Sequence, residues 1–109
     1  MLVKELADMM DLVPFLMPDP DREVKGGYVG DLLSWVMGRA QEGDAWLTIM
    51  SNQNVAAVAL MAEVSCVVLT EGVEPDPALL QRARQQGIDL LGTKLSTFDA
   101  AAVLKQLMR

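Results

Sequence analysis

Strand–helix alternation, repeated three times in the second half of the sequence, most constrains what this chain can fold into. In each unit a short apolar stretch is followed by a polar turn and then by a segment with helical character. The three apolar stretches occupy residues 45–50, 66–70 and 88–92. Strands that alternate with helices form mostly parallel sheets, and parallel strands bring the loops at their carboxyl ends to one edge. The sequence therefore predicts an α/β fold with a mostly parallel sheet, and it predicts at which edge a ligand would bind.

The helices of these units are predicted from their capping residues. Residues 55–62 form an apolar run that follows Asn52, a favoured cap residue. The next helix occupies residues 76–87, with an aspartate–proline pair at its start and a glycine at its end. The last begins at Ser96, which stands three residues before Asp99 in the spacing of a capping box.

The first half of the chain is less regular. We expect a helix, an extended stretch, a turn, a short edge strand and a second helix, over residues 2–11, 12–17, 18–21, 23–25 and 30–40. Gly26 and Gly27 are predicted to form a tight passage of the backbone into that second helix.

Composition narrows the class of protein. The 109 residues suffice for a single domain over residues 1–109. No apolar run reaches the roughly 18–20 residues that cross a bilayer, so we expect a cytoplasmic protein that does not bind a membrane. A net charge of −6 with scattered basic residues argues against nucleic-acid binding. The sequence has no histidine and one cysteine, so we expect no cofactor and no metal, although an all-oxygen site for Mg²⁺ or Ca²⁺ stays open.

Motifs of catalysis are missing from the sequence. It contains neither the P-loop spacing nor the Gly-x-Gly-x-x-Gly fingerprint. The carboxylate pairs Asp19/Asp21 and Glu74/Asp76 lie in predicted turns, where solvated turn residues explain them more simply than acid–base catalysis. We therefore expect a protein that is not an enzyme.

The polar turns at the predicted carboxyl edge are the candidate ligand site. They carry hydroxyl and amide side chains, one lysine, and backbone N–H groups at helix starts, which suit an anion or the polar parts of a nucleotide. The predicted ligand-binding residues are Thr48, Ser51, Asn52, Asn54, Thr70, Glu71, Thr93, Lys94 and Ser96. An alternative stays open, because helix capping alone explains residues such as Asn52, Asp76 and Ser96.

Two features suggest a second subunit. Trp35 lies on the side of its helix away from the apolar stripe formed by Leu32, Leu33, Val36, Met37 and Ala40. The helix over residues 55–62 has no polar side, so it must be covered all round. We therefore predict a homodimer. Its predicted interface residues are Trp35, Val55, Val58 and Ala59. Packing of Trp35 under the N-terminal segment is the alternative.

Several stretches of the chain resemble the DRTGG domain family. They are VKELA, GGYVGDLLSWVM, DAWLTI, NVAAVA and TKLSTF, at residues 3–7, 26–37, 44–49, 54–59 and 93–98. The five-letter signature of the family is not present verbatim, and the nearest stretch is EVKGG at residues 23–27. The resemblance implies a three-layer α/β/α fold like the N-terminal domain of HPr kinase/phosphatase. A kinase label is not supported, because the P-loop domain of that enzyme is missing here.

The resemblance also implies a regulatory role, since domains of this family accompany CBS domains or the catalytic part of some phosphotransacetylases. Together with the turn cluster, it favours a non-catalytic regulatory or ligand-sensing module that binds a small anionic metabolite or nucleotide and acts as a homo-oligomer. The alternative is a structural adaptor that docks onto a metabolic enzyme. A small enzyme that uses Ser, Thr, Asp or Lys is a third and weaker hypothesis.

Overall fold

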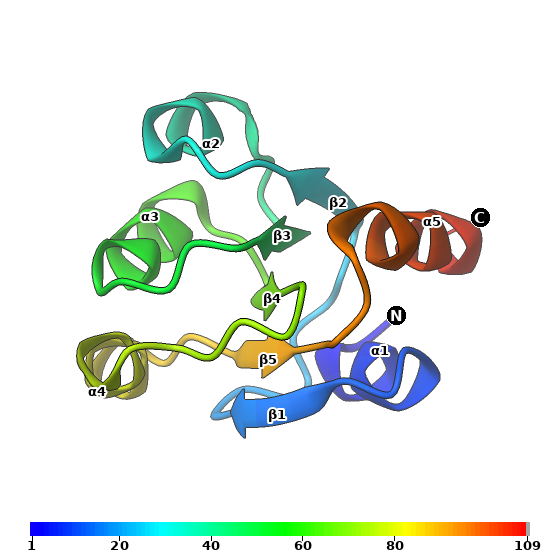
Figure 1. The fold of residues 1–109 in the computed structure, drawn as a ribbon, viewed down its shortest axis with the longest axis horizontal. Helices are drawn as coiled ribbons and strands as arrows, with labels where there is room; N and C mark the ends of the chain where they lie inside the picture. Colours follow the sequence, from blue (N-terminus) through cyan, green and yellow to red (C-terminus); the bar gives the residue numbers. More distant parts are fainter. Residues whose placement is uncertain (109) are drawn as a thin grey trace.

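A computed structural model describes residues 1–108 and contains one sheet with helices on both faces (Figure 1). The strands are β1 (Val13–Leu16), β2 (Gly26–Val29), β3 (Asp44–Thr48), β4 (Cys66–Leu69) and β5 (Leu90–Gly92). The helices are α1 (Val3–Met9), α2 (Leu33–Arg39), α3 (Asn54–Ala62), α4 (Pro77–Gln86) and α5 (Thr97–Leu107). Within residues 1–108 no helix has the length and apolar character needed to span a bilayer.

The sheet is mostly parallel, as the sequence predicts. Its strand order is β1-β5-β4-β3-β2. The strands from β2 to β5 run parallel to one another, and β1 pairs antiparallel with β5. Each parallel connection passes through a helix, which is the crossover that parallel pairing requires. β1 and β2 are therefore the two edge strands.

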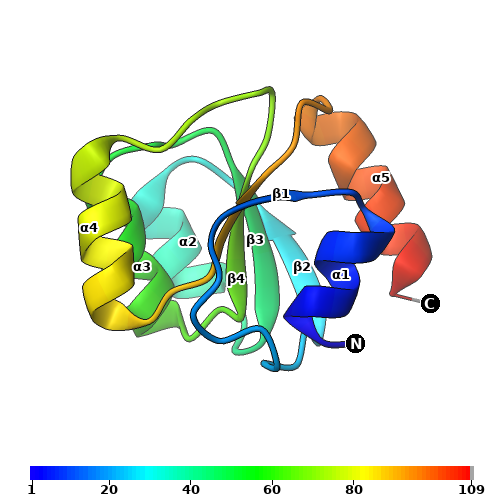
Figure 2. The same ribbon diagram turned by 90° about the horizontal axis from the view of Figure 1, so that it is seen from below.

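Alternating side chains of the parallel strands build two cores. Leu47 and Val68 pack with residues of α1 and α5, whereas Trp46 and Val67 pack with residues of α2, α3 and α4. All four side chains are fully buried, and each buried aliphatic side chain contributes about 1.5–3 kcal/mol to stability. Figure 2 shows the resulting three layers, with the sheet between the two groups of helices. The three-layer α/β/α fold is confirmed.

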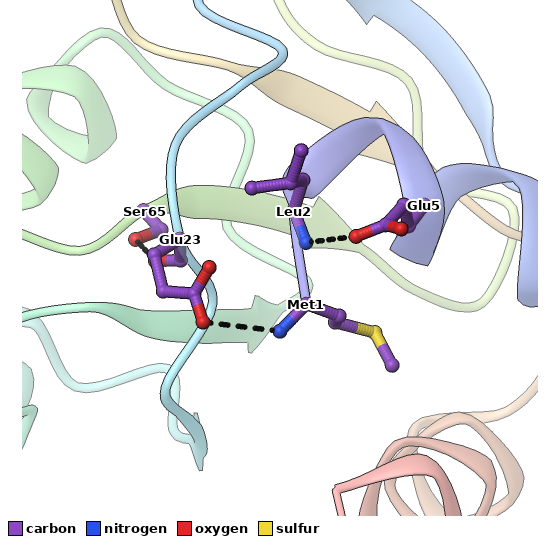
Figure 3. A network of polar contacts seen from close by, with 5 residues as sticks. All are labelled: Met1, Leu2, Glu5, Glu23 and Ser65. Atoms are coloured by element: carbon purple, nitrogen blue, oxygen red, sulfur yellow. Dashed lines mark hydrogen bonds and ion pairs between the residues drawn. The ribbon is translucent and has the colours of Figure 1, made fainter.

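The N-terminal segment is fixed at the amino ends of the strands (Figure 3). Leu2 forms an isolated antiparallel bridge with Glu23, and the Met1 amino group lies 3.3 Å from Glu23 Oε1. The Leu2 N–H donates to Glu5 Oε1 at 2.7 Å, and Ser65 Oγ donates to the carbonyl oxygen of Glu23. The edge strand predicted over residues 23–25 is reduced to this one bridge.

Strand β2 corrects the prediction for the glycine pair. Gly26 and Gly27 do not form a tight passage into a helix, because both belong to β2 and pair in parallel with β3. A Cβ on Gly27 would lie 2.5 Å from Leu104 Cδ2, so the missing side chain lets α5 pack directly on the strand. Helix α2 accordingly begins at Leu33 and not at residue 30.

Helix α3 packs differently from the prediction. Val55, Val58 and Ala59 are at most 6% exposed and belong to the core between the sheet and its helices, so the prediction that they contact a second subunit is wrong. The prediction that this helix is covered on every side is also wrong, because one side of α3 faces solvent. Leu60 and Met61 are 48% and 68% exposed, on the side that neither the sheet nor a neighbouring helix covers.

Helix α2 buries only one residue of its predicted stripe. Val36 is fully buried, but Leu32 is largely exposed because it precedes the helix. Trp35 is 53% exposed, and the Arg39 guanidinium lies 3.8 Å from the centroid of its ring. The N-terminal helix lies on the other face of the sheet, so it does not cover Trp35 (Figure 2).

Candidate functional site

The loops that follow β3, β4 and β5 meet along one edge of the sheet (Figure 2). This arrangement follows from the parallel direction of the three strands, and it brings together the loops that carry the predicted ligand residues. The hydrogen bonds of these loops decide which polar groups are open to a ligand.

The β4–α4 and β5–α5 loops are hydrogen-bonded to each other. The Glu71 N–H donates to the Leu95 carbonyl at 2.8 Å, and the Gly72 N–H donates to the Thr93 carbonyl at 2.9 Å. The Glu71 carboxylate accepts the Thr97 N–H at 2.8 Å. Glu71 and Gly72 both have positive φ, at 61° and 72°, so the chain reverses sharply there. These bonds hold the two loops together as one unit. The Glu71 carboxylate therefore has a structural role in this unit.

All three predicted threonines are buried, although Thr93 keeps 9% of its surface exposed. Thr48 and Thr70 are fully buried. The Thr48 hydroxyl donates to Asp31 at 2.8 Å, and the Thr70 hydroxyl lies 2.6 Å from that of Thr97. Their hydroxyls stabilise the edge and are not open to a ligand in this structure.

Asp31 is a residue of this edge that the sequence analysis did not identify. The helix predicted over residues 30–40 would place Asp31 in its first turn, but α2 begins two residues later, at Leu33. Its carboxylate accepts both the Thr48 hydroxyl and the Ile49 N–H, at 2.8 and 3.0 Å. An aspartate in a loop commonly accepts hydrogen bonds from nearby backbone N–H groups. The partner of Asp31 on β3, however, depends on the strand order, which the sequence alone does not specify.

The predicted cap positions are correct at α4 and α5, but of these two helices only α5 has a capping bond from a side chain, and the cap position of α3 is Gln53 and not Asn52. Ser96 Oγ accepts the Asp99 N–H at 3.0 Å, which confirms the cap of α5. Asn52 instead accepts the N–H of Asn54 in a local turn, one residue ahead of the α3 cap position. Asp76 stands at the cap position of α4 without a capping bond, because its carboxylate accepts the Ser51 hydroxyl at 3.2 Å.

The N-terminus of α5 therefore has few donors left for an anion. The Thr97 N–H is bonded to Glu71, and the Asp99 N–H and the Ala100 N–H are bonded to Ser96. This result favours the capping alternative for Ser96.

Lys94 is the predicted ligand residue with the most accessible charge. Its side chain is exposed, and its ammonium forms no ion pair with any residue between 1 and 108. Lys94 and Thr93 line a cavity of about 130 Å³ at the carboxyl ends of β4 and β5. The other lining residues are Val13, Phe15, Gly72, Val73, Glu74 and Gly92. The remaining predicted ligand residues lie outside this cavity.

Phe15 reaches the cavity from β1, which sequence reasoning did not place beside β5. Val13 pairs with Gly92 across the antiparallel ladder. A Cβ on Gly92 would collide with the Phe15 ring, so the glycine allows the ring to lie across the strand. The sequence shows an extended stretch around Phe15 but gives no signal for its neighbour.

Two buried groups with raised pKa values, Asp89 and Cys66, lie at the amino ends of the strands, away from the loop cluster. Asp89 precedes β5 and is fully buried, and burial raises the pKa of its carboxyl to about 6. One of its oxygens accepts the Asp19 N–H at 2.8 Å, and the other has no partner within the described chain. Burial likewise raises the pKa of the nearby Cys66 thiol to about 12. Residues 1–108 contain no group of three or more histidine, cysteine, aspartate or glutamate residues that could hold a metal ion.

The sheet, its two layers of helices and the loops at the carboxyl ends of its strands define a three-layer α/β domain (Figure 2). The family model of the DRTGG domain matches residues 28–107. The chain belongs to the DRTGG domain family, which confirms the resemblance seen in the sequence. A comparison with curated proteins finds no match.

Solved structures confirm the fold. Seven chains match, and one is the regulatory region, with CBS and DRTGG domains, of a pyrophosphatase from Clostridium perfringens, in complex with the activator diadenosine tetraphosphate. The TM-score is 0.77 at 17% sequence identity, over 95% of this chain and 46% of that chain. This chain thus spans less than half of that regulatory region.

Proposed function

We propose that this chain is a non-catalytic regulatory domain that binds a small anionic metabolite or nucleotide at the carboxyl edge of its sheet. The observation that carries the proposal is Lys94, an unpaired cation beside a cavity whose walls are loops bonded to each other. Loops fixed in this way are preorganised, so little conformational entropy is lost when a ligand binds.

The cavity has room for one anionic group of the ligand beside Lys94. Its volume of about 130 Å³ is close to that of a few water molecules, which is the size of a phosphate and not of a whole nucleotide. In the proposed complex the phosphate contacts Lys94 and the Thr93 hydroxyl, and the rest of the ligand lies over the loops. The regulatory role is supported by the relative, whose regulatory region was solved with a nucleotide activator.

A thermal-shift measurement tests this proposal. Diadenosine tetraphosphate, ATP, AMP and inorganic phosphate are added separately to the purified protein. A ligand at 100 times its Kd stabilises a domain by about 2.7 kcal/mol, which raises the Tm of a chain of this size by on the order of 10 °C. The substitution Lys94→Ala removes this shift, whereas Lys4→Ala, a control on α1, keeps it. The proposal fails if none of the four compounds raises the Tm, or if Lys94→Ala binds as well as the wild type.

We further propose that the chain forms a homodimer through exposed apolar side chains of α2 and α3. Trp35, Leu60 and Met61 supply this surface in place of the buried residues first predicted.

The adaptor function, in which a metabolic enzyme covers the same side chains, is the second candidate. Sedimentation equilibrium at micromolar concentration separates the two. A dimer that Trp35→Ser dissociates supports the first, and the mass of a single chain contradicts it.

A further inference from the structure

Strand β2 leaves one row of backbone groups unpaired. It is an edge strand, bonded only to β3. The Gly30 N–H donates to the Leu47 carbonyl on the β3 side at 3.2 Å. Backbone groups alternate in direction along a strand, so the N–H and C=O of Gly27 and Val29 point to the open side. Because β3 is the one strand within residues 1–108 that pairs with β2, these four groups have no partner strand there.

An apolar groove runs beside this open edge. It has a volume of about 420 Å³ and lies between β2 and α5, which are adjacent in the fold (Figure 1). Gly27 and Val29 form its strand side, and Ala101, Leu104 and Met108 form its helix side. Leu104 lies against Gly27, and the small side chain of Ala101 leaves the groove open beside this contact. A groove between an edge strand and a helix is the geometry in which an extended peptide adds to a sheet.

The charges at the groove indicate which peptide fits. Lys25 and Lys105 both line it, although the chain as a whole carries a net charge of −6. Lys25 is already bonded to Glu42 at 2.9 Å, whereas Lys105 forms no ion pair with the residues that the structure describes. A second copy of β2 has no acidic residue in positions 25–29, so it does not complement Lys105.

We propose that the groove between β2 and α5 binds an extended acidic peptide segment of a partner protein. The segment lies beside β2 as a sixth strand and exchanges hydrogen bonds with Gly27 and Val29. An apolar side chain of the segment packs on Leu104 and Met108, and a neighbouring carboxylate pairs with Lys105. This peptide site is separate from the cavity at Lys94, so each can exist without the other.

Selection from a random ten-residue peptide library, displayed on phage, tests the proposal. We expect enriched peptides that combine an apolar residue with Asp or Glu. For a synthetic copy of the best peptide, fluorescence anisotropy should show at least a tenfold weaker affinity for the Lys105→Glu variant. Arg84→Glu makes the same charge change on α4, across the sheet, and should leave the affinity unchanged.

Hydrogen exchange measured by NMR locates the peptide independently of any substitution. In the free protein the amides of Gly27 and Val29 should exchange fast, and in the complex they should be protected. The amide of Gly30, already bonded to Leu47, serves as the internal reference. The proposal is overturned if no peptide is enriched, if the bound peptide leaves the Gly27 and Val29 amides unprotected, or if Lys105→Glu binds it unchanged. It is also overturned if those amides are already protected in the free protein, because a second copy then occupies the edge.

Discussion

Asp89 shows how a single buried group adjusts the stability of the domain. Its carboxylate anchors the turn at Asp19 to the amino end of β5 through one hydrogen bond, while its other oxygen is buried without a partner within residues 1–108. Burial is the largest influence on its pKa, and the negative charge of Asp19 acts in the same direction. Arg22 and the Asp19 N–H act in the opposite direction, and they do not outweigh burial.

The raised pKa of Asp89 predicts a pH dependence of stability. The folded pKa of about 6 lies above the ordinary aspartate pKa of 3.8, so the folded state holds the proton more tightly than the unfolded state. The protonated Asp89 carboxyl therefore contributes to the free energy of unfolding below pH 3.8, and this contribution is lost as the pH rises through 6. Between pH 5 and pH 7 the loss amounts to about 1 kcal/mol.

Urea denaturation at pH 5 and pH 7 measures this effect. Asp89→Asn should remove about 1 kcal/mol of the difference between the two pH values, because the amide does not titrate. Asp21→Asn, an exposed position in the same turn, should keep the wild-type difference. An unchanged difference in Asp89→Asn would show that this carboxyl does not titrate in that range.

At the scale of elements, glycines decide how closely β2 and α5 pack. Gly27 faces Leu104, and its Cβ would lie 2.5 Å from that side chain. Gly38 in α2 has no atom within 4 Å of an added Cβ. The two positions form a matched pair, because the same substitution meets a packed interface at one and open space at the other.

Alanine at these two glycines should therefore have opposite effects. Gly27→Ala should lower the free energy of unfolding by about 1–2 kcal/mol, because it overpacks the contact with Leu104. Gly38→Ala should raise it by about 0.5–1 kcal/mol, because alanine favours helix and loses less entropy on folding. Chemical denaturation of both variants gives the two values. A neutral Gly27→Ala would mean that α5 does not press on β2.

The cap of α5 gives a second prediction at this scale. Ser96→Ala leaves the Asp99 N–H without its acceptor, so we expect a loss of about 1 kcal/mol in the free energy of unfolding. Asn52→Ala should cost less, because Asn52 stabilises a local turn and not the cap of α3. Equal losses in urea denaturation would contradict this assignment of the caps.

The sequence predicted the elements with strong local signals and missed those that depend on distant partners. The apolar stretches of β3 and β4 and the cap at Ser96 are encoded in neighbouring residues, and they are where they were expected. β2 was missed because two of its four residues are glycines, and its pairing depends on β3, which lies across a helix in the sequence. The same limit applies to the site. Lys94 was identified from its place after a strand, but the ring of Phe15 enters through an antiparallel pairing that no local pattern specifies.

At the scale of the whole molecule, the parallel sheet separates three surfaces. The carboxyl edge carries the loops and the Lys94 cavity, the open side of β2 carries the peptide groove, and α2 and α3 carry exposed apolar side chains. The proposed regulatory function needs two such surfaces, one for a signal and one for the protein that it controls. The separation means that a substitution on one surface should leave the other two intact.

The central claim is that a ligand binds at the carboxyl edge, and an NMR titration of ¹⁵N-labelled protein tests it most directly. Diadenosine tetraphosphate and inorganic phosphate are the probes. The account predicts saturable shifts that are largest for the amides of Gly72, Val73 and Lys94, with those of β2 and of the C-terminal end of α5 unchanged. Saturation without any shift at these three amides, or the absence of any shift with either probe, would contradict it.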